Sequence, residues 1–202
     1  VTLKKLAMMA TGNDTFPVTR IADPAFQNTG LQDSTLLIHL CPSYVSFAIY
    51  QNVSNTVLAY CQQPLSGDDR FGEAMHILRT DAWTNTSFAH VHLAIRPDDF
   101  ALVPKDLFDP REIPTYLNFH SYKEIGGSQL FDRMDAIGIV GAYHISHHVL
   151  DAFTRQYPNL SVWATPTPFI TLGIREYKSS KGDNLLVLFE DDLIHIIALN
   201  QG

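Results

Sequence analysis

Residues 34–64 read STLLIHLCPSYVSFAIYQNVSNTVLAYCQQP, and this stretch decides the fold of the chain. It holds apolar runs at 36–40, 44–50 and 56–61, separated by polar breaks at 42–43 and 51–55. Short runs rich in β-branched and aromatic residues, bounded by Pro, Ser and Asn, are typical of strands. Because short breaks of this kind connect neighbouring antiparallel strands, the stretch predicts a three-stranded antiparallel meander.

The overall composition is that of a folded, acidic protein. The 202 residues are 46% hydrophobic and 17% charged, which is the opposite of the balance found in disordered chains. A net charge of −7 disfavours nonspecific binding to nucleic acid and to anionic membranes, since both require a basic surface. The sequence has neither an apolar run of about eighteen residues nor a signal-peptide pattern, so we expect no membrane insertion and a cytoplasmic location.

After the meander, helical and strand patterns alternate along the chain. Ser66 as a capping residue and the apolar spacing of 71–78 predict a first helix, and Asp109-Pro110 predicts the start of a second. We expect further strands at 88–95, 100–104, 135–143 and 160–163, helices at 146–157 and 165–177, and a polar loop at 120–130. This order predicts an α/β fold, a ribonuclease-H-like lobe in which helices flank a mixed five-stranded sheet.

The segment NLLVLFEDDLIHIIALNQG at 184–202 repeats the opening pattern in a weaker form. Its apolar runs, 185–189 and 193–199, flank three acidic residues and predict a second hairpin. Because a two-stranded hairpin alone is only marginally stable, we interpret it as the start of a second, truncated lobe. The expected domains are an N-terminal arm or edge strand at 1–32, a first lobe at 33–180 and the first hairpin of the second lobe at 181–202.

The stretch FALVPKDLFDPREIPTYLNF at 100–119 resembles the family catalogued as domain of unknown function 3822. The segments DSTLLIHLCPSYVSFAIY at 33–50 and LSVWATPTPFI at 160–170 are similar to that family as well. The resemblance covers about 34–202 and implies an actin-like ATPase fold, in which two ribonuclease-H-like lobes enclose a nucleotide. It implies no established activity. More distantly, the chain resembles actin-like scaffold proteins of pilus and secretion machines.

The resemblance directs attention to the turns of the two hairpins, where actin-like ATPases hold phosphate with an Asp, a Gly and small hydroxyl residues. The first turn, at 40–44, has neither Asp nor Gly, and Pro42 lacks an N–H donor. The second, at 189–193, has no Gly, and its three carboxylates would repel phosphate unless a metal bridged them. We therefore expect no cofactor and no nucleotide hydrolysis.

Two functional hypotheses follow from these turns. The first is a non-hydrolysing, pseudo-ATPase binding or scaffold protein without catalytic residues, which acts through an unidentified protein partner. Exposed strand edges in the final hairpin would also favour a homodimer. The alternative is a nucleotide-dependent ATPase or kinase with an atypical phosphate loop. In that case ATP and Mg²⁺ would be contacted by Ser43, Glu190, Asp191 and Asp192.

The remaining patterns favour structural interpretations. His90 and His92 would share one face of a strand, but no third metal ligand is evident beside them. Cys41 and Cys61 fall at strand ends, where buried thiols are ordinary. Gly126-Gly127-Ser128 could cradle an anion, although a lone motif of this kind is usually only a loop.

Overall fold

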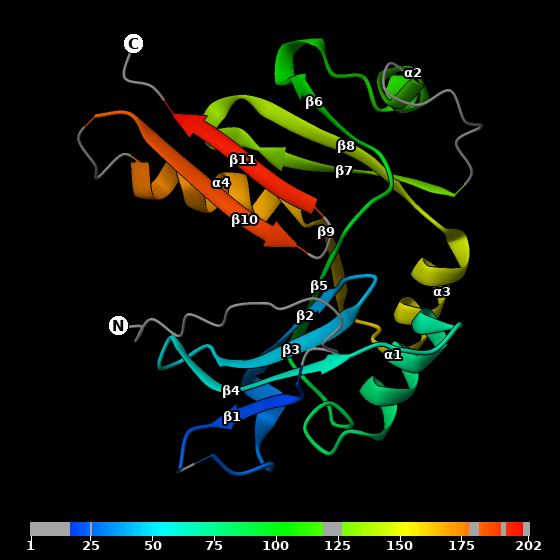
Figure 1. Cartoon of the computed structure of the whole chain (residues 1–202), viewed down its shortest axis with the longest axis vertical. Helices are drawn as coiled ribbons and strands as arrows, with labels where there is room; N and C mark the ends of the chain where they lie inside the picture. Colours follow the sequence, from blue (N-terminus) through cyan, green and yellow to red (C-terminus); the bar gives the residue numbers. More distant parts are fainter. Residues whose placement is uncertain (1–16, 25, 119–126, 178–181, 191–192, 200–202) are drawn as a thin grey trace.

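The structure is a computed structural model that describes residues 17–24, 26–118, 127–177, 182–190 and 193–199. Figure 1 shows two connected parts: a large sheet in the lower half, and a smaller sheet with a separate hairpin in the upper half. Within the described residues, no helix is long and apolar enough to cross a membrane.

The lower part is a six-stranded mixed sheet in the order β1-β4-β3-β2-β5-β9. The predicted meander is confirmed, because β2 (Ser34–Leu40), β3 (Tyr44–Gln51) and β4 (Thr56–Pro64) pair antiparallel. Strands β5 (His90–Ile95) and β9 (Leu160–Ala164) extend it in parallel with β2. The sheet has six strands rather than five because the short β1 (Thr19–Ala22) pairs with the free edge of β4.

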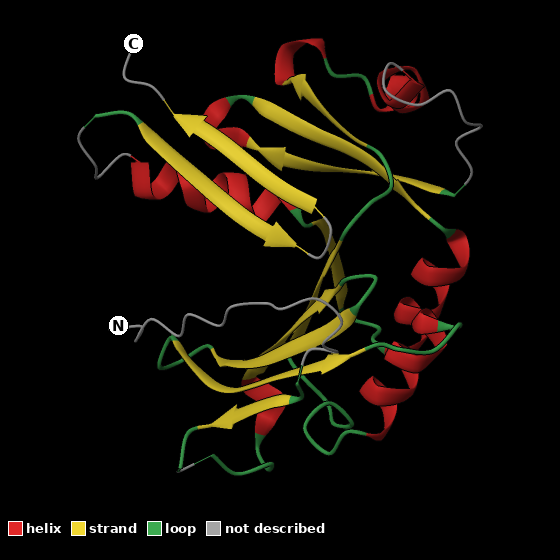
Figure 2. Ribbon diagram, viewed as in Figure 1, coloured by secondary structure: helices red, strands yellow, loops and turns green. Residues whose placement is uncertain are grey.

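Helices α1 (Arg70–Thr80) and α3 (His147–Gln156) lie beside the lower sheet (Figure 2) and close its core. Leu78 and Phe153 are fully buried there, because alternate strand residues turn their apolar side chains toward the helices. The predicted Ser66 cap is wrong. Asp69 immediately precedes α1, and its Oδ1 accepts a hydrogen bond from the Gly72 N–H at 2.8 Å, whereas Ser66 lies too far upstream.

The upper part contains a three-stranded antiparallel sheet in the order β6-β8-β7. Its strands are β6 (Phe100–Pro104), β7 (Ser128–Met134) and β8 (Ile139–Ile145), and α2 (Ile113–Asn118) packs on it. The sequence predicts a loop at 120–130, of which 120–126 lie outside the described residues, and one strand at 135–143. Instead β7 begins at Ser128, and the 3-10 turn Asp135–Ile137 ends at Gly138 with φ +64, which reverses the chain into β8. Further 3-10 turns are Leu31–Asp33, Lys105–Leu107 and Pro110–Glu112.

Helix α4 (Pro166–Tyr177) connects the two parts, because it begins directly after β9 and supports the hairpin of β10 (Asn184–Glu190) and β11 (Leu193–Leu199). Gly173 allows this close contact: a Cβ there would lie 3.3 Å from Leu186 and 3.5 Å from Ile197. The interpretation of this hairpin as the start of a second lobe stays a prediction, as do the predicted domain boundaries.

Asp132 of β7 joins the upper sheet to the start of α4. Its Oδ2 accepts hydrogen bonds from the Ala164 N–H at 2.9 Å and from Thr167 Oγ1 at 2.7 Å, and its Oδ1 accepts from the Tyr143 hydroxyl at 3.0 Å. Burial raises the pKa of Asp132, although these hydrogen bonds act in the opposite direction. The buried carboxyl group therefore links β7 to the end of β9 and to the first turn of α4 by hydrogen bonds.

Candidate functional site

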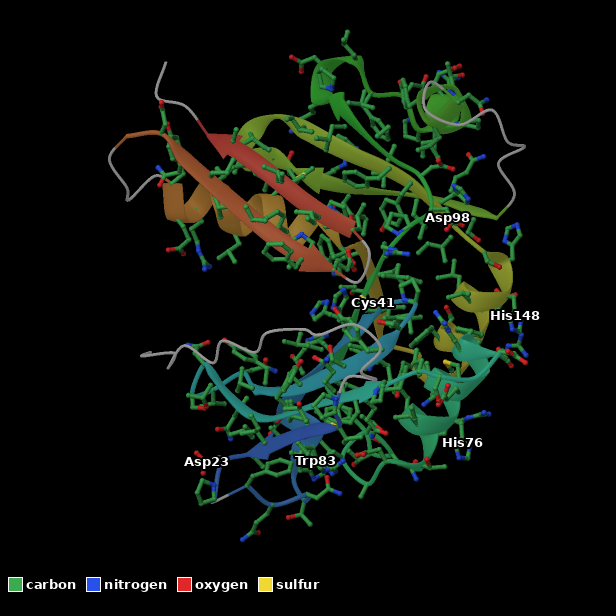
Figure 3. All side chains as sticks on the ribbon, viewed as in Figure 1. Asp23, Cys41, His76, Trp83, Asp98 and His148 are labelled. Atoms are coloured by element: carbon green, nitrogen blue, oxygen red, sulfur yellow. The ribbon has the colours of Figure 1, made fainter. Side chains whose placement is uncertain are left out.

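The end of β2 and the end of β10 meet at a cluster of ionisable side chains. His39 and Cys41 come from the β2–β3 hairpin, and Glu190 is the last residue of β10. Figure 3 labels Cys41 at the level where the lower sheet faces the β10–β11 hairpin. The two turns that the sequence analysis singled out are therefore in direct contact.

Glu190 is the centre of this cluster. Its Oε1 lies 3.0 Å from His39 Nε2 and accepts a hydrogen bond from Cys41 Sγ at 3.1 Å. Its Oε2 lies 2.7 Å from His195 Nε2 on β11. Both carboxylate oxygens are thus occupied by partners from the two hairpins.

Glu190 is buried, yet it is held in its charged form. The Glu190 side chain has no exposed surface, and those of His39 and His195 are 27% and 17% exposed. Burial acts to raise the pKa of Glu190, but the hydrogen bonds from His39, Cys41 and His195 outweigh it and lower the pKa to about 2. A buried carboxylate of this kind is stable only because its partners supply compensating polar contacts.

Strand periodicity places each of these side chains. In β10 the more buried positions alternate with exposed ones, and Glu190 continues the inward row that contains Leu186 and Leu188. His39 lies between the buried Ile38 and Leu40 and turns to the opposite face of the sheet. The Cys41 N–H donates to the Tyr44 carbonyl at 3.0 Å, which closes the turn and directs the thiol toward Glu190.

A largely apolar cleft of about 600 Å³ lies beside the cluster, between the open face of the lower sheet and α4. Its walls include His39, Ala48, Tyr60 and Trp163 from the sheet and Leu172 from α4. His92 also lines the cleft, and its Nδ1 accepts a hydrogen bond from Trp163 Nε1 at 3.3 Å. The His39 side chain therefore lines this cleft and also contacts Glu190.

Of the four residues named for the nucleotide-dependent alternative, the structure describes Ser43 and Glu190. Glu190 lies at the junction, and Ser43 lies in the β2–β3 turn, where its carbonyl accepts a hydrogen bond from the Leu65 N–H at 2.7 Å. Asp191 and Asp192 lie outside the described residues. Sequence reasoning missed His39, Cys41 and His195. One pattern in the sequence could have identified them. Both hairpin turns carry residue types that bind metals or transfer protons, His39-x-Cys41 in one and Glu190-x₄-His195 in the other.

The residues present do not fit Mg²⁺-ATP in the manner of actin-like ATPases. At the first turn, the Cys41 N–H is used within the hairpin and Pro42 has none. At the junction, the ionised Glu190 occupies the space between the turns and bonds to His39, Cys41 and His195 rather than facing an open cavity. No reaction step through a bound nucleotide can be derived from this arrangement.

The other candidate sites keep structural roles. His90 and His92 are not joined by a third potential metal ligand within the described part of the chain. Gly127 has φ +110, and a Cβ there would lie within clashing distance of the Ile145 carbonyl oxygen, so its position requires glycine. Cys41 and Cys61 are both buried, as expected, and neither forms a disulfide.

Comparisons with known proteins agree with this fold. A family model described as protein of unknown function (DUF3822) matches residues 23–202. A crystal structure from Bacteroides thetaiotaomicron VPI-5482, described as a protein with actin-like ATPase fold and unknown function, aligns with a TM-score of 0.79 and 16% sequence identity. The alignment covers 87% of this chain and 68% of that chain. No curated protein matches the sequence. The expected actin-like fold is confirmed, and at this identity the similarity concerns the fold alone.

Proposed function

The chain belongs to the family described as protein of unknown function (DUF3822), and we propose that it is a non-hydrolysing binding protein of actin-like fold. It acts as a scaffold through contacts with protein partners. The observation that carries the proposal is the direct contact of the β2–β3 turn with the end of β10 through Glu190. The two turns bond to each other where an actin-like ATPase would place phosphate between them.

The electrostatics of the junction support this proposal. Phosphate groups bind where N–H donors and cations converge, and an ionised carboxylate at the same point repels them. To admit phosphate, Glu190 would have to leave its contacts with His39, Cys41 and His195. Hydrogen bonds to charged groups contribute about 1.5–3 kcal/mol each, so this rearrangement is costly.

The outer face of the β10–β11 hairpin supports binding of a protein partner. Val187 pairs with Ile196 and Phe189 with Ile194, and all four side chains are exposed, Phe189 to 74%. Leu185 continues the same row at 64% exposure. A contiguous apolar surface of this kind commonly marks a protein–protein contact. Partner residues with apolar side chains would bury it.

The first experiment tests nucleotide. Thermal unfolding of the full chain is measured with and without millimolar Mg²⁺-ATP and Mg²⁺-ADP, together with phosphate release. We expect no change in the unfolding midpoint and no release, in the wild type and in the Glu190→Gln variant alike. A ligand at a hundredfold excess over its dissociation constant stabilises by about 2.7 kcal/mol, so binding would be detected easily. A midpoint shift with nucleotide, or phosphate release above background, would overturn the proposal.

A second experiment tests the contact surface. The full chain is used to capture proteins from cells of its source, and the double variant Val187→Ser/Ile196→Ser is compared with Leu102→Ser, which alters an exposed leucine on β6. We expect the hairpin variant to lose the captured partner and the Leu102→Ser variant to keep it. Equal capture by all three proteins would argue against the hairpin as the contact surface.

The nucleotide-dependent alternative keeps one favourable observation, because Glu190 lies at the junction of the two turns, where a bound metal ion would bridge its carboxylate to phosphate. It predicts that the Asp191→Asn/Asp192→Asn variant loses nucleotide-dependent activity. The scaffold proposal predicts that the same variant still binds its partner with unchanged affinity.

A further inference from the structure

The side chains at this junction are of types that commonly bind metal ions. A metal site there would be a property beyond the proposed scaffold role. We propose that His39 Nε2, Cys41 Sγ and Glu190 Oε1 bind one zinc-class divalent metal ion, which fastens the β2–β3 turn to the end of β10. Glu190 is 151 positions from His39 and 149 from Cys41 in the sequence, so the site exists only in the folded chain.

The geometry supports a bound ion. The three atoms form a triangle with edges of 3.0 Å from His39 to Glu190, 3.1 Å from Cys41 to Glu190 and 3.3 Å from Cys41 to His39. Tetrahedral zinc, with bonds of 2.0–2.3 Å, holds its ligand atoms about 3.3–3.7 Å apart. The triangle therefore needs to open by only a few tenths of an ångström.

The donor set selects the metal. One imidazole, one thiolate and one carboxylate are ligands of zinc and related transition metals, whereas Mg²⁺ and Ca²⁺ prefer oxygen ligands alone. When the ion binds, the Cys41 thiol releases its proton to solvent and His39 presents a bare Nε2 with its proton on Nδ1. Two anionic ligands then neutralise one divalent cation, which is a favourable charge balance for a buried site.

Neighbouring side chains are placed to orient these ligands. His195 Nε2 lies 2.7 Å from Glu190 Oε2, the oxygen that is not part of the triangle, and so directs Oε1 toward the ion. Thr165 Oγ1 lies 3.3 Å from His39 Nε2 and is a further polar contact at the edge of the site. We assign His195 as a positioning residue rather than a ligand.

The ion also has a route to its site. His39 lines the cleft of about 600 Å³, and Cys41 lines a second cavity of about 280 Å³ on the other side. A partly exposed histidine at a cleft wall leaves a fourth coordination position for water. A metal bound there would connect the same two turns that a nucleotide connects in actin-like ATPases.

The test uses the full chain without a histidine tag, freed of metal by chelator and dialysis. Co²⁺ is titrated first, because a thiolate ligand gives a ligand-to-metal charge-transfer band in the near ultraviolet, and Zn²⁺ is then added in competition. We expect one ion per chain, a thiolate band that Zn²⁺ removes, and a higher unfolding midpoint with Zn²⁺.

The chain offers a matched control in its second cysteine. Cys61 is also buried, and its thiol contacts Arg20 and Gln63 rather than the junction. Cys41→Ser should abolish the band and weaken binding by at least about 100-fold, whereas Cys61→Ser should leave both unchanged. If Cys41→Ser fails to fold, His195→Ala decides: it should keep the band and bind about 10–100-fold more weakly.

Several outcomes would overturn the site. They are the absence of a thiolate band in the folded wild type, loss of the band in Cys61→Ser, and His195→Ala binding as tightly as the wild type. Each can be read independently of the nucleotide experiment, because no nucleotide is present in this titration.

Discussion

Asp132 Oδ2 accepts a hydrogen bond from Thr167 Oγ1 at 2.7 Å, which joins β7 to the first turn of α4. We expect Asp132→Ala to destabilise the chain by about 3 kcal/mol, because it leaves buried donors without a partner. Asp132→Asn keeps one carbonyl oxygen for Ala164 and Thr167, so its effect should be less than half as large. Urea unfolding of the three proteins measures these differences, and equal losses for Ala and Asn would contradict the assigned role.

The raised pKa of Asp132 predicts that the stability of the folded chain depends on pH. Burial raises the pKa of Asp132 in the folded state, so the folded chain retains this proton at pH values where the unfolded chain has lost it. The stability of the wild type relative to Asp132→Asn should therefore be greatest below the ordinary Asp pKa of about 3.9 and should decline as pH rises through the raised pKa. Urea unfolding of both proteins over a range of pH tests the sign. A relative stability that grows with pH would refute it.

Phe153 of α3 is one of the large, fully buried side chains of the lower core. Its ring is fully buried and lies 6.2 Å from the Phe71 ring and 6.4 Å from the Tyr157 ring, measured between centroids. Phe153→Ala should destabilise by about 3–5 kcal/mol, because it removes apolar contacts and leaves a cavity. Val53→Ala is the control, since Val53 is 87% exposed and should cost less than about 0.5 kcal/mol. Thermal unfolding compares the two, and similar midpoints would mean that α3 is not packed as described.

Alanine substitutions at Gly127 and Gly182 distinguish the free-energy cost of backbone strain from the cost of steric overlap. Both have positive φ, +110 and +88, but only at Gly127 would a Cβ collide with another backbone group, the Ile145 carbonyl. Gly182→Ala should cost about 1–2 kcal/mol from conformation alone, and Gly127→Ala clearly more. Urea unfolding gives both values, and the prediction fails if Gly182→Ala is the more damaging change.

Local patterns in the sequence were sufficient for most of the secondary structure of the lower sheet. The meander at 34–64 was predicted because its strands are adjacent in sequence and their apolar runs are bounded by turn residues. Strand β7 was missed, since Asp132 interrupts its apolar pattern and the burial of that carboxyl depends on α4. Strand β1 was left as an arm or edge strand because four mostly exposed residues carry little periodic signal.

The residues alone predicted the meander and the absence of Gly from either hairpin turn, because these features depend on residues close together in the chain. The actin-like fold was implied by the family resemblance rather than by any local pattern, and the comparisons confirm it. The hydrogen bonds of Glu190 to His39, Cys41 and His195, by contrast, arise only when the chain is folded. Glu190 is 151 positions from His39 and lies in a different hairpin, so no local periodicity relates the two. Their contact follows from α4, which carries the β10–β11 hairpin toward the end of β2 and thereby forms the junction.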